Sequence, residues 1–168
     1  MVLVMTMTPL HMTEHNHGLA AVGLVISGHT FGMFAFSPIS GWLAGRYGTP
    51  AIIAAGLGLS AFSSVLAAVA PPDGGTILFI ALFLLGVGWN FGFVAGSALL
   101  TEGLDGAERT TLQGATDAMI WSSAAAAALG SGIVVAAASY TALGLLGAAL
   151  ILFPVLAMLR GRAALRRS

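Results

Sequence analysis

The chain has 168 residues, and only 7% of them are charged, against the roughly 25% of an ordinary soluble domain. Hydrophobic residues make up 58% of the sequence and the mean hydropathy is +0.97, which leaves too little polar material to cover a water-soluble globule. The zero net charge excludes a broad basic face for nucleic acid, and the absence of cysteine excludes disulfides, thiolate metal ligands and cysteine nucleophiles. We therefore predict an all-α integral membrane protein.

Residues 1–12 are apolar but give only about 18 Å of helix, too short to cross the ~30 Å of hydrocarbon in a bilayer. We interpret them as the outer end of a truncated helix. The long uncharged run 118–159 would form a helix of about 63 Å, so it is expected to fold back once, near residue 140. The prediction is one membrane domain, 1–168, with a partial helix at 1–12, five transmembrane helices at 19–45, 49–70, 76–100, 111–136 and 141–160, and a cytoplasmic tail at 161–168.

The arginines indicate the orientation of these spans. If the spans alternate and the C-terminal tail is cytoplasmic, every arginine lies on the inner side of the membrane: Arg46, Arg109, Arg160, Arg162, Arg166 and Arg167. The opposite side, formed by residues 11–17 and 71–75, carries Glu14 and Asp73 and no arginine. This asymmetry follows the positive-inside rule and predicts a multi-pass protein of the cell (plasma) membrane with its C-terminus in the cytoplasm.

Two segments carry a family resemblance. Residues 41–48, GWLAGRYG, resemble the loop motif G-x-L-A-D-R-x-G-R-R of the major facilitator superfamily (MFS), with matches at Gly41, Leu43, Arg46 and Gly48. Residues 86–102, GVGWNFGFVAGSALLTE, are similar to the tenth span of bacterial members of that superfamily. The resemblance implies the C-terminal six-helix repeat, here the end of span seven plus spans eight to twelve.

Small residues recur at helical spacing within the predicted spans. Gly88, Gly92 and Gly96 lie four residues apart on one face, and Gly28 and Gly32 repeat the spacing in an earlier span. Because helices associate in lipid through close packing at small residues, these faces are expected to contact neighbouring helices. Packing alone explains the pattern, although a transport path also needs closely approaching helices.

Polar residues within the membrane are energetically costly, so they indicate a functional site better than small residues do. His29 lies about 15 Å from the outer end of its span, and Asn90 and Trp89 are expected at a comparable depth. In transporters of this architecture the substrate site lies near the midplane, so His29, Trp89 and Asn90 are candidate lining residues. The alternative is that His29 and Asn90 lock helices together and that Trp89 fills space.

Asp117 is the acid placed inside a predicted span, about two turns from its cytoplasmic start. Because hydrocarbon favours the neutral form of a carboxyl group, Asp117 is a candidate proton carrier. His29 is the competing candidate, since an unperturbed imidazole titrates near neutral pH. The alternative for Asp117 is a structural cap or ion pair at the inner face.

The cluster of His11, Glu14, His15 and His17 does not follow the zinc-protease order His-Glu-x-x-His, and we interpret it as a solvated outer loop rather than a metal site. No cofactor and no metal is predicted. An enzyme is disfavoured, because the acids lie mostly on one side of the membrane and three of the four histidines on the other.

The predicted function is transport of a small solute across the lipid bilayer by a secondary active transporter, with coupling to protons and with an N-terminal half that this chain lacks. Two alternatives stay open. Two copies of the chain could associate into a small carrier or channel, or the chain could be a non-transporting membrane subunit that binds a partner. Nucleic acid is not an expected partner.

Overall fold

A computed structural model describes residues 1–71 and 73–165, with side chains described as far as Arg160. Within these residues every regular element is a helix, and five helical segments are long and apolar enough to cross a membrane. The helices are α1 (Val2–Glu14), α2 (Leu19–Phe34), α3 (Ser37–Tyr47), α4 (Thr49–Ala68), α5 (Gly75–Leu100), α6 (Gly106–Ala137), α7 (Tyr140–Leu150) and α8 (Leu152–Leu165). The all-α membrane fold is confirmed.

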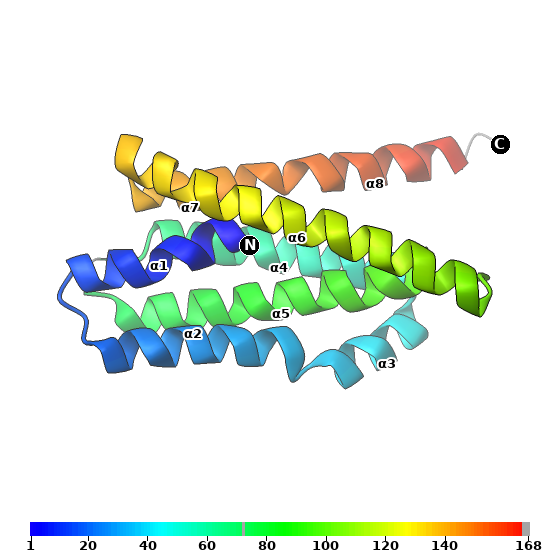
Figure 1. Cartoon of the computed structure of the whole chain (residues 1–168), viewed down its shortest axis with the longest axis horizontal. Helices are drawn as coiled ribbons and strands as arrows, with labels where there is room; N and C mark the ends of the chain where they lie inside the picture. Colours follow the sequence, from blue (N-terminus) through cyan, green and yellow to red (C-terminus); the bar gives the residue numbers. More distant parts are fainter. Residues whose placement is uncertain (72, 166–168) are drawn as a thin grey trace.

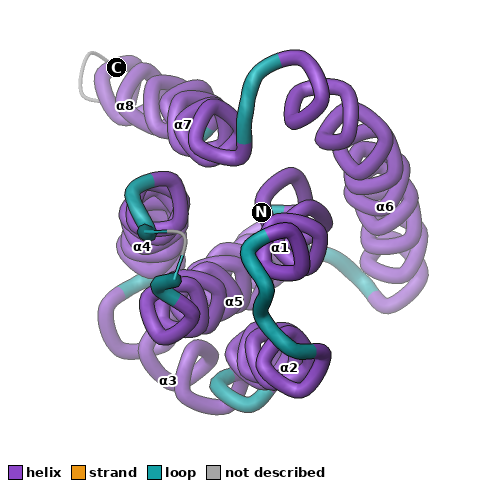
Figure 2. Tube along the Cα trace, turned by 90° about the vertical axis from the view of Figure 1, so that its left-hand side faces the viewer, coloured by secondary structure: helices purple, strands orange, loops and turns teal. Residues whose placement is uncertain are grey.

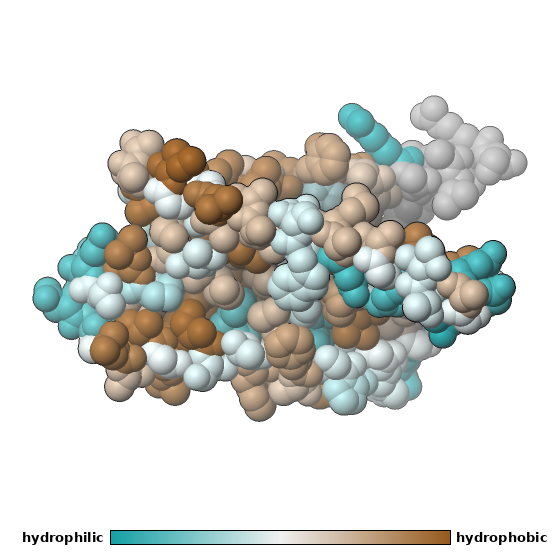
Figure 3. All heavy atoms as spheres, viewed as in Figure 1, coloured by the Kyte–Doolittle hydropathy of each residue, from teal (hydrophilic) through white to brown (hydrophobic). Residues whose placement is uncertain are grey.

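The candidate spans alternate in direction. Figure 1 shows the α1–α2, α4–α5 and α6–α7 connections at one end of the bundle, and the α3–α4 and α5–α6 connections at the other end together with the C-terminus. Polar residues gather at these two ends, and a mainly apolar band lies between them (Figure 3). The shape is that of a helical bundle whose middle would face hydrocarbon.

Several helix ends differ from the predicted spans. α6 begins at Gly106 rather than at 111, because the Asp105 carboxylate caps its first turn: Oδ1 accepts the backbone N–H of Ala107 at 2.9 Å and of Glu108 at 2.8 Å. α8 continues to Leu165, so most of the predicted tail at 161–168 is helical, and residues 166–168 lie outside the described part. α1 extends to Glu14 rather than ending at residue 12.

Two of the five spans are interrupted, and a proline accounts for each interruption. α2 ends at Phe34, four residues before Pro38, and α7 ends at Leu150, four residues before Pro154. A proline inside a helix lacks the N–H that would bond to the carbonyl four residues earlier, and its ring clashes with that carbonyl. The first crossing segment, Leu19–Tyr47, is therefore two helices, α2 and α3, joined at residues 35–36.

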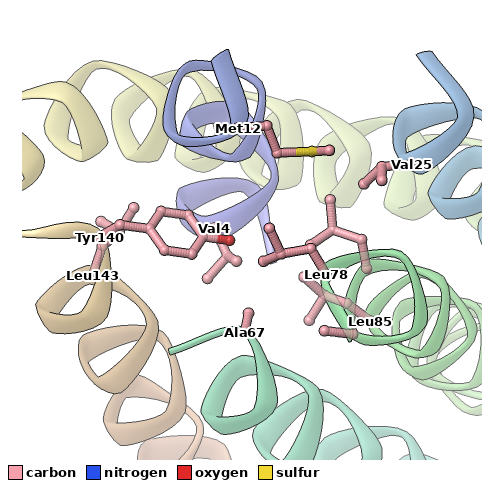
Figure 4. Close-up of a cluster of buried hydrophobic side chains, with 10 residues drawn as sticks. Val4, Met12, Val25, Ala67, Leu78, Leu85, Tyr140 and Leu143 are labelled. Atoms are coloured by element: carbon pink, nitrogen blue, oxygen red, sulfur yellow. The ribbon is translucent and has the colours of Figure 1, made fainter. Parts of the chain in front are cut away.

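Helix α5 is the centre of the bundle. Viewed along the helices in Figure 2, α5 lies between α4, α2 and α1, whereas α6 stands at the edge and approaches the bundle beside α1. At the end that carries the α1–α2 connection, apolar side chains from α1, α4, α5 and α7 converge on one core (Figure 4), which includes Val4, Ala67, Leu78 and Leu143. The open flank of α5, between α2 and α6, is left without a covering helix in this chain.

Glycines set how closely the helices approach. A Cβ atom built on Gly32 would lie 2.6 Å from the Phe83 carbonyl oxygen, and one on Gly28 would lie 2.5 Å from the Phe79 ring. A Cβ on Gly88 would lie 2.5 Å from Ser60 Oγ in α4. At Gly32 and Gly88 backbone atoms of the neighbouring helix leave room only for hydrogen, whereas at Gly28 the close neighbour is the Phe79 side chain.

The expected glycine ladder on α5 is divided between two environments. Gly88 faces α4, whereas Cβ atoms on Gly92 and Gly96 would meet no atom within 4 Å. The reason is the helical period of 3.6 residues, which rotates positions four apart by about 40° each time. The face of α5 thus turns from the α4 contact towards the uncovered flank along the helix.

Candidate functional site

His29 lies in the contact between α2 and α5 and is fully buried. Its ring Nδ1 donates to the carbonyl oxygen of Leu82 in α5 at 2.7 Å, since a carbonyl can only accept. Nε2 is then the acceptor nitrogen of the neutral ring, and it is buried without a hydrogen-bond partner among the described residues. The close approach of α2 at this point depends on Gly86, where a Cβ would collide with the His29 carbonyl oxygen.

Asn90 joins α5 to the interruption between α2 and α3, and its side chain is 1% exposed. Its Nδ2 group donates to the Met33 carbonyl oxygen at 2.7 Å and to Ser37 Oγ at 2.8 Å, while its Oδ1 accepts from the Ser40 hydroxyl. Every polar atom of the amide therefore has a partner within the chain.

The sequence interpretation expected His29 and Asn90 at a comparable depth in the bundle. The structure places them at different depths. On α2 the Asn90 contact, at Met33, lies one turn or about 6 Å beyond His29. On α5, His29 reaches Leu82, two turns before Asn90. Each side chain is buried in a helix contact and neither is on the uncovered flank.

An aromatic face lies next to these contacts, formed by Phe34 of α2 and by Trp89 and Phe93 of α5. The Trp89 and Phe93 rings are stacked, with centroids 4.6 Å apart and planes inclined by 12°. Phe34 meets Trp89 edge-on, with centroids 6.0 Å apart and planes inclined by 71°. Phe34 is 58% exposed, and Trp89 and Phe93 are half-buried, so the three rings present open π surface. The sequence analysis found Trp89 and missed Phe34 and Phe93, which only helical spacing and packing bring together.

Asp117 lies on α6 opposite this part of α5. The depth of Asp117 relative to α5 follows from Gln113, one turn earlier on α6. Gln113 Nε2 donates to Ser97 Oγ in α5 at 3.4 Å. α5 and α6 are antiparallel, so Asp117 lies roughly level with Phe93, four residues before Ser97. The Asp117 side chain is half-buried on the α6 face that bears Gln113. The aromatic face and the Asp117 carboxylate are thus at a similar depth along the bundle.

The loop-motif residues lie at the C-terminal end of α3. The Arg46 guanidinium carbon is 5.7 Å from the ring centroids of both Trp42 and Tyr47, a cation–π geometry. Gly48 ends the helix with φ of +86°, a conformation that glycine adopts without strain. Gly41 is exposed and Leu43 is half-buried on the same short helix.

The histidine cluster is divided between helix α1 and the loop that follows it. α1 includes His11 and Glu14, which corrects the loop expected there, whereas His15 and His17 lie after the end of the helix. The His11 ring stacks on Tyr140 of α7 with centroids 4.1 Å apart and an interplanar angle of 8°. His15 Nδ1 donates to the His11 carbonyl oxygen at 2.7 Å. Among the described residues no three histidine, cysteine or acidic side chains are grouped so as to hold a metal ion.

Comparison with known proteins agrees with this architecture. The family model of the Major Facilitator Superfamily matches residues 1–167. Two relatives from Bacillus subtilis are both described as uncharacterized MFS-type transporters: YddS is 46% identical over 158 residues, and YdeG is 44% identical over 164 residues. The alignments cover 92% of this chain and 36% of YddS, and 96% of this chain and 38% of YdeG.

A third relative is the riboflavin transporter RfnT of Brucella anthropi, which is 35% identical over 158 residues, covering 94% of this chain and 38% of RfnT. The chain therefore spans a little over a third of the length of these relatives. No solved structure matches it. The family match over almost the whole sequence, together with five membrane-crossing helical segments, shows that the chain belongs to the Major Facilitator Superfamily.

Proposed function

We propose that this chain is the C-terminal part of a secondary active transporter that moves a small solute across the plasma membrane, with its C-terminus in the cytoplasm. The observation that carries the proposal is the superfamily match over residues 1–167. The names of the relatives, which are all transporters, support it. The uncovered flank of α5 is where further membrane helices would complete a path for the solute.

The aromatic face of Phe34, Trp89 and Phe93 is proposed to contact the solute. Stacked rings with an open side bind flat, conjugated molecules through offset stacking and apolar burial. The description of RfnT as a riboflavin transporter supports this class, because riboflavin is a flat, fused-ring molecule. The proposed substrate class is therefore a small solute with a planar aromatic ring system.

Asp117 is proposed to couple transport to protons. Its carboxyl lies roughly level with Phe93, so its protonation state would change the charge beside the bound solute. When the path opens to water, the charged form of the carboxyl group is favoured. When the path closes and the group faces the apolar band, the neutral form costs less free energy. His29 stays the second candidate, because its buried Nε2 can accept a proton when the α2–α5 contact opens.

The test is transport by the full-length protein in proteoliposomes, with riboflavin as the first solute and an imposed pH gradient. Trp89→Ala is expected to raise KM about 5- to 150-fold, since stacking on one aromatic ring is worth roughly 1–3 kcal/mol. Trp89→Phe keeps a ring and should lose less. Trp121→Phe is the matched control, because Trp121 is an exposed tryptophan on α6 outside the aromatic face.

The coupling proposal is tested in the same vesicles. Asp117→Asn should abolish accumulation driven by the pH gradient while leaving exchange of solute at equal pH intact. His29→Gln should leave gradient-driven accumulation in place if Asp117 carries the proton. Equal accumulation by wild type and Asp117→Asn would refute the role of Asp117, and unchanged KM in Trp89→Ala would refute the aromatic face.

A further inference from the structure

The interruption between α2 and α3 leaves backbone carbonyl groups in the membrane without helical donors. Pro38 has no N–H to offer the carbonyl of Phe34, and Met33 lies in the same last turn of α2. An unpaired carbonyl in hydrocarbon is costly, so groups that donate to these acceptors stabilise a broken span.

Asn90 and Ser37 together supply donors to the last turn of α2. One Nδ2 hydrogen goes to the Met33 carbonyl at 2.7 Å, and the other goes to Ser37 Oγ at 2.8 Å. The Ser37 hydroxyl in turn donates to the Phe34 carbonyl at 2.9 Å. Both carbonyls are thus reached from a single side chain of α5, one directly and one through Ser37.

The same amide also holds the other side of the interruption. Its Oδ1 accepts from Ser40, which is fully buried in the first turn of α3. Asn90 therefore touches α2 through Met33 and α3 through Ser37 and Ser40. By contrast, no side chain among the described residues donates to the α7–α8 interruption at Leu150 and Ile151, so proline alone does not require such a device.

We propose that Asn90 is a positioning residue that clamps the broken span, holding α3 against α5 at a joint that has no continuous helix. The consequence is a link between two parts of the chain. Asn90 is adjacent to Trp89 of the aromatic face, and α3 carries the motif residues Gly41 and Arg46. A displacement of α5 at Asn90 would therefore release α3. This inference depends on the hydrogen bonds and not on the identity of the solute.

The test measures how often α3 leaves α5 in the full-length protein in native membranes. Ala44, on α3, is 7% exposed and packs against Ile52 and Ala95, and Ala67 on α4 is 1% exposed in the apolar core away from the joint, so each thiol is compared with its own rate in the protein that keeps Asn90. The chain has no cysteine, so Ala44→Cys or Ala67→Cys introduces its single thiol, and any cysteine elsewhere in the protein is replaced. The probe is a small water-soluble maleimide, and the readout is the labelling rate of each thiol.

Asn90→Leu removes the amide while keeping nearly the same volume. Labelling of the Ala44→Cys protein is expected to rise about tenfold, since several buried hydrogen bonds are lost, whereas labelling of the Ala67→Cys protein stays unchanged. Ser63→Ala is the matched control: it removes a buried hydroxyl that donates only within α4, to Leu59, and should change neither rate. Equal rises at both thiols, or no rise at Ala44, would overturn the proposal.

Pro38→Ala provides a rescue that a general packing role does not predict. With an N–H restored at residue 38, the Phe34 carbonyl regains a backbone donor and α2 can continue into α3, so Asn90→Leu should raise Ala44→Cys labelling less in this background. An undiminished rise would contradict the clamp. If Asn90→Leu fails to accumulate in the membrane, Ser37→Ala carries the same test with a smaller expected rise, and an unchanged rate there would also overturn the proposal.

Discussion

Asn90 of α5 and Met33 of α2 are joined by a hydrogen bond of 2.7 Å from the side-chain amide to the backbone carbonyl oxygen, across 57 positions of sequence. This bond ties α2 to α5 at the point where the span that contains α2 is broken. It also explains why a polar side chain at this depth is buried without reaching the uncovered flank of α5. The stability of this bundle therefore depends on a few contacts at which α5 meets its neighbours.

The first prediction concerns the α2–α5 contact. Gly86→Ala should lower the free energy of unfolding by about 1–3 kcal/mol, because the added Cβ would collide with the His29 carbonyl oxygen and backbone cannot move aside cheaply. Gly92→Ala in the same helix meets no atom within 4 Å, so it should be neutral or slightly stabilising. Thermal unfolding of the detergent-solubilised chain measures both, and equal midpoints for the two variants would show that the contact is looser than described.

The second prediction concerns the hydrogen bond between α1 and α7. Thr8 Oγ1 lies 2.8 Å from the Tyr140 hydroxyl and 2.8 Å from the Val4 carbonyl oxygen, so the single Thr8 proton goes to Val4 and Tyr140 donates to Thr8. Tyr140→Phe should lower the free energy of unfolding by about 1 kcal/mol. Tyr47→Phe is the control, since Tyr47 is 61% exposed, and it should leave the unfolding midpoint unchanged. A midpoint for Tyr140→Phe that matches wild type would contradict a buried bond at this position.

A third prediction tests the start of α6. Asp105→Ala removes the carboxylate that accepts two backbone N–H groups, and it should lower helix stability by about 1 kcal/mol. Hydrogen exchange of the amides at residues 107–110 is the measurement, and faster exchange is expected there while the amides of α5 keep their protection. Glu102→Ala, which removes an exposed acid outside the helix, is the control. Unchanged exchange in Asp105→Ala would place the helix start later, near the residue 111 expected from the sequence.

The orientation in the membrane is the fourth prediction. The α4–α5 connection and the α5–α6 connection lie at opposite ends of the bundle (Figure 1). In intact cells, an impermeant thiol reagent should label Asp73→Cys from outside, whereas Glu102→Cys should react only after the cells are opened. The reverse pattern would show that the orientation is opposite to the one proposed. Labelling of both thiols from outside would show that α5 does not cross the membrane.

The sequence was sufficient to predict the class of the protein and the presence of five helical segments long and apolar enough to cross a membrane. These follow from one-dimensional properties: long uncharged apolar runs, arginines confined to alternate connections, and the residues that resemble the superfamily motif. Since the bilayer requires every crossing segment to satisfy its own backbone hydrogen bonds, run length alone predicts helices. Pro38 and Pro154 were visible too, but the interruptions they cause at Phe34 and Leu150 were not predicted.

The site was less accessible to sequence reasoning, because it depends on rotation and depth within the bundle. His29 and Asn90 were expected at a comparable depth as lining residues, and both are buried in the contact of α2 with α5, about one turn apart along α2. Phe34 and Phe93 gave no signal of their own in a chain rich in apolar residues, and only the packing of α2 on α5 brings them beside Trp89. Composition determined that this chain crosses a membrane as helices, whereas the direction in which each polar or aromatic side chain points was decided by helix rotation, which the closest glycine contacts fix.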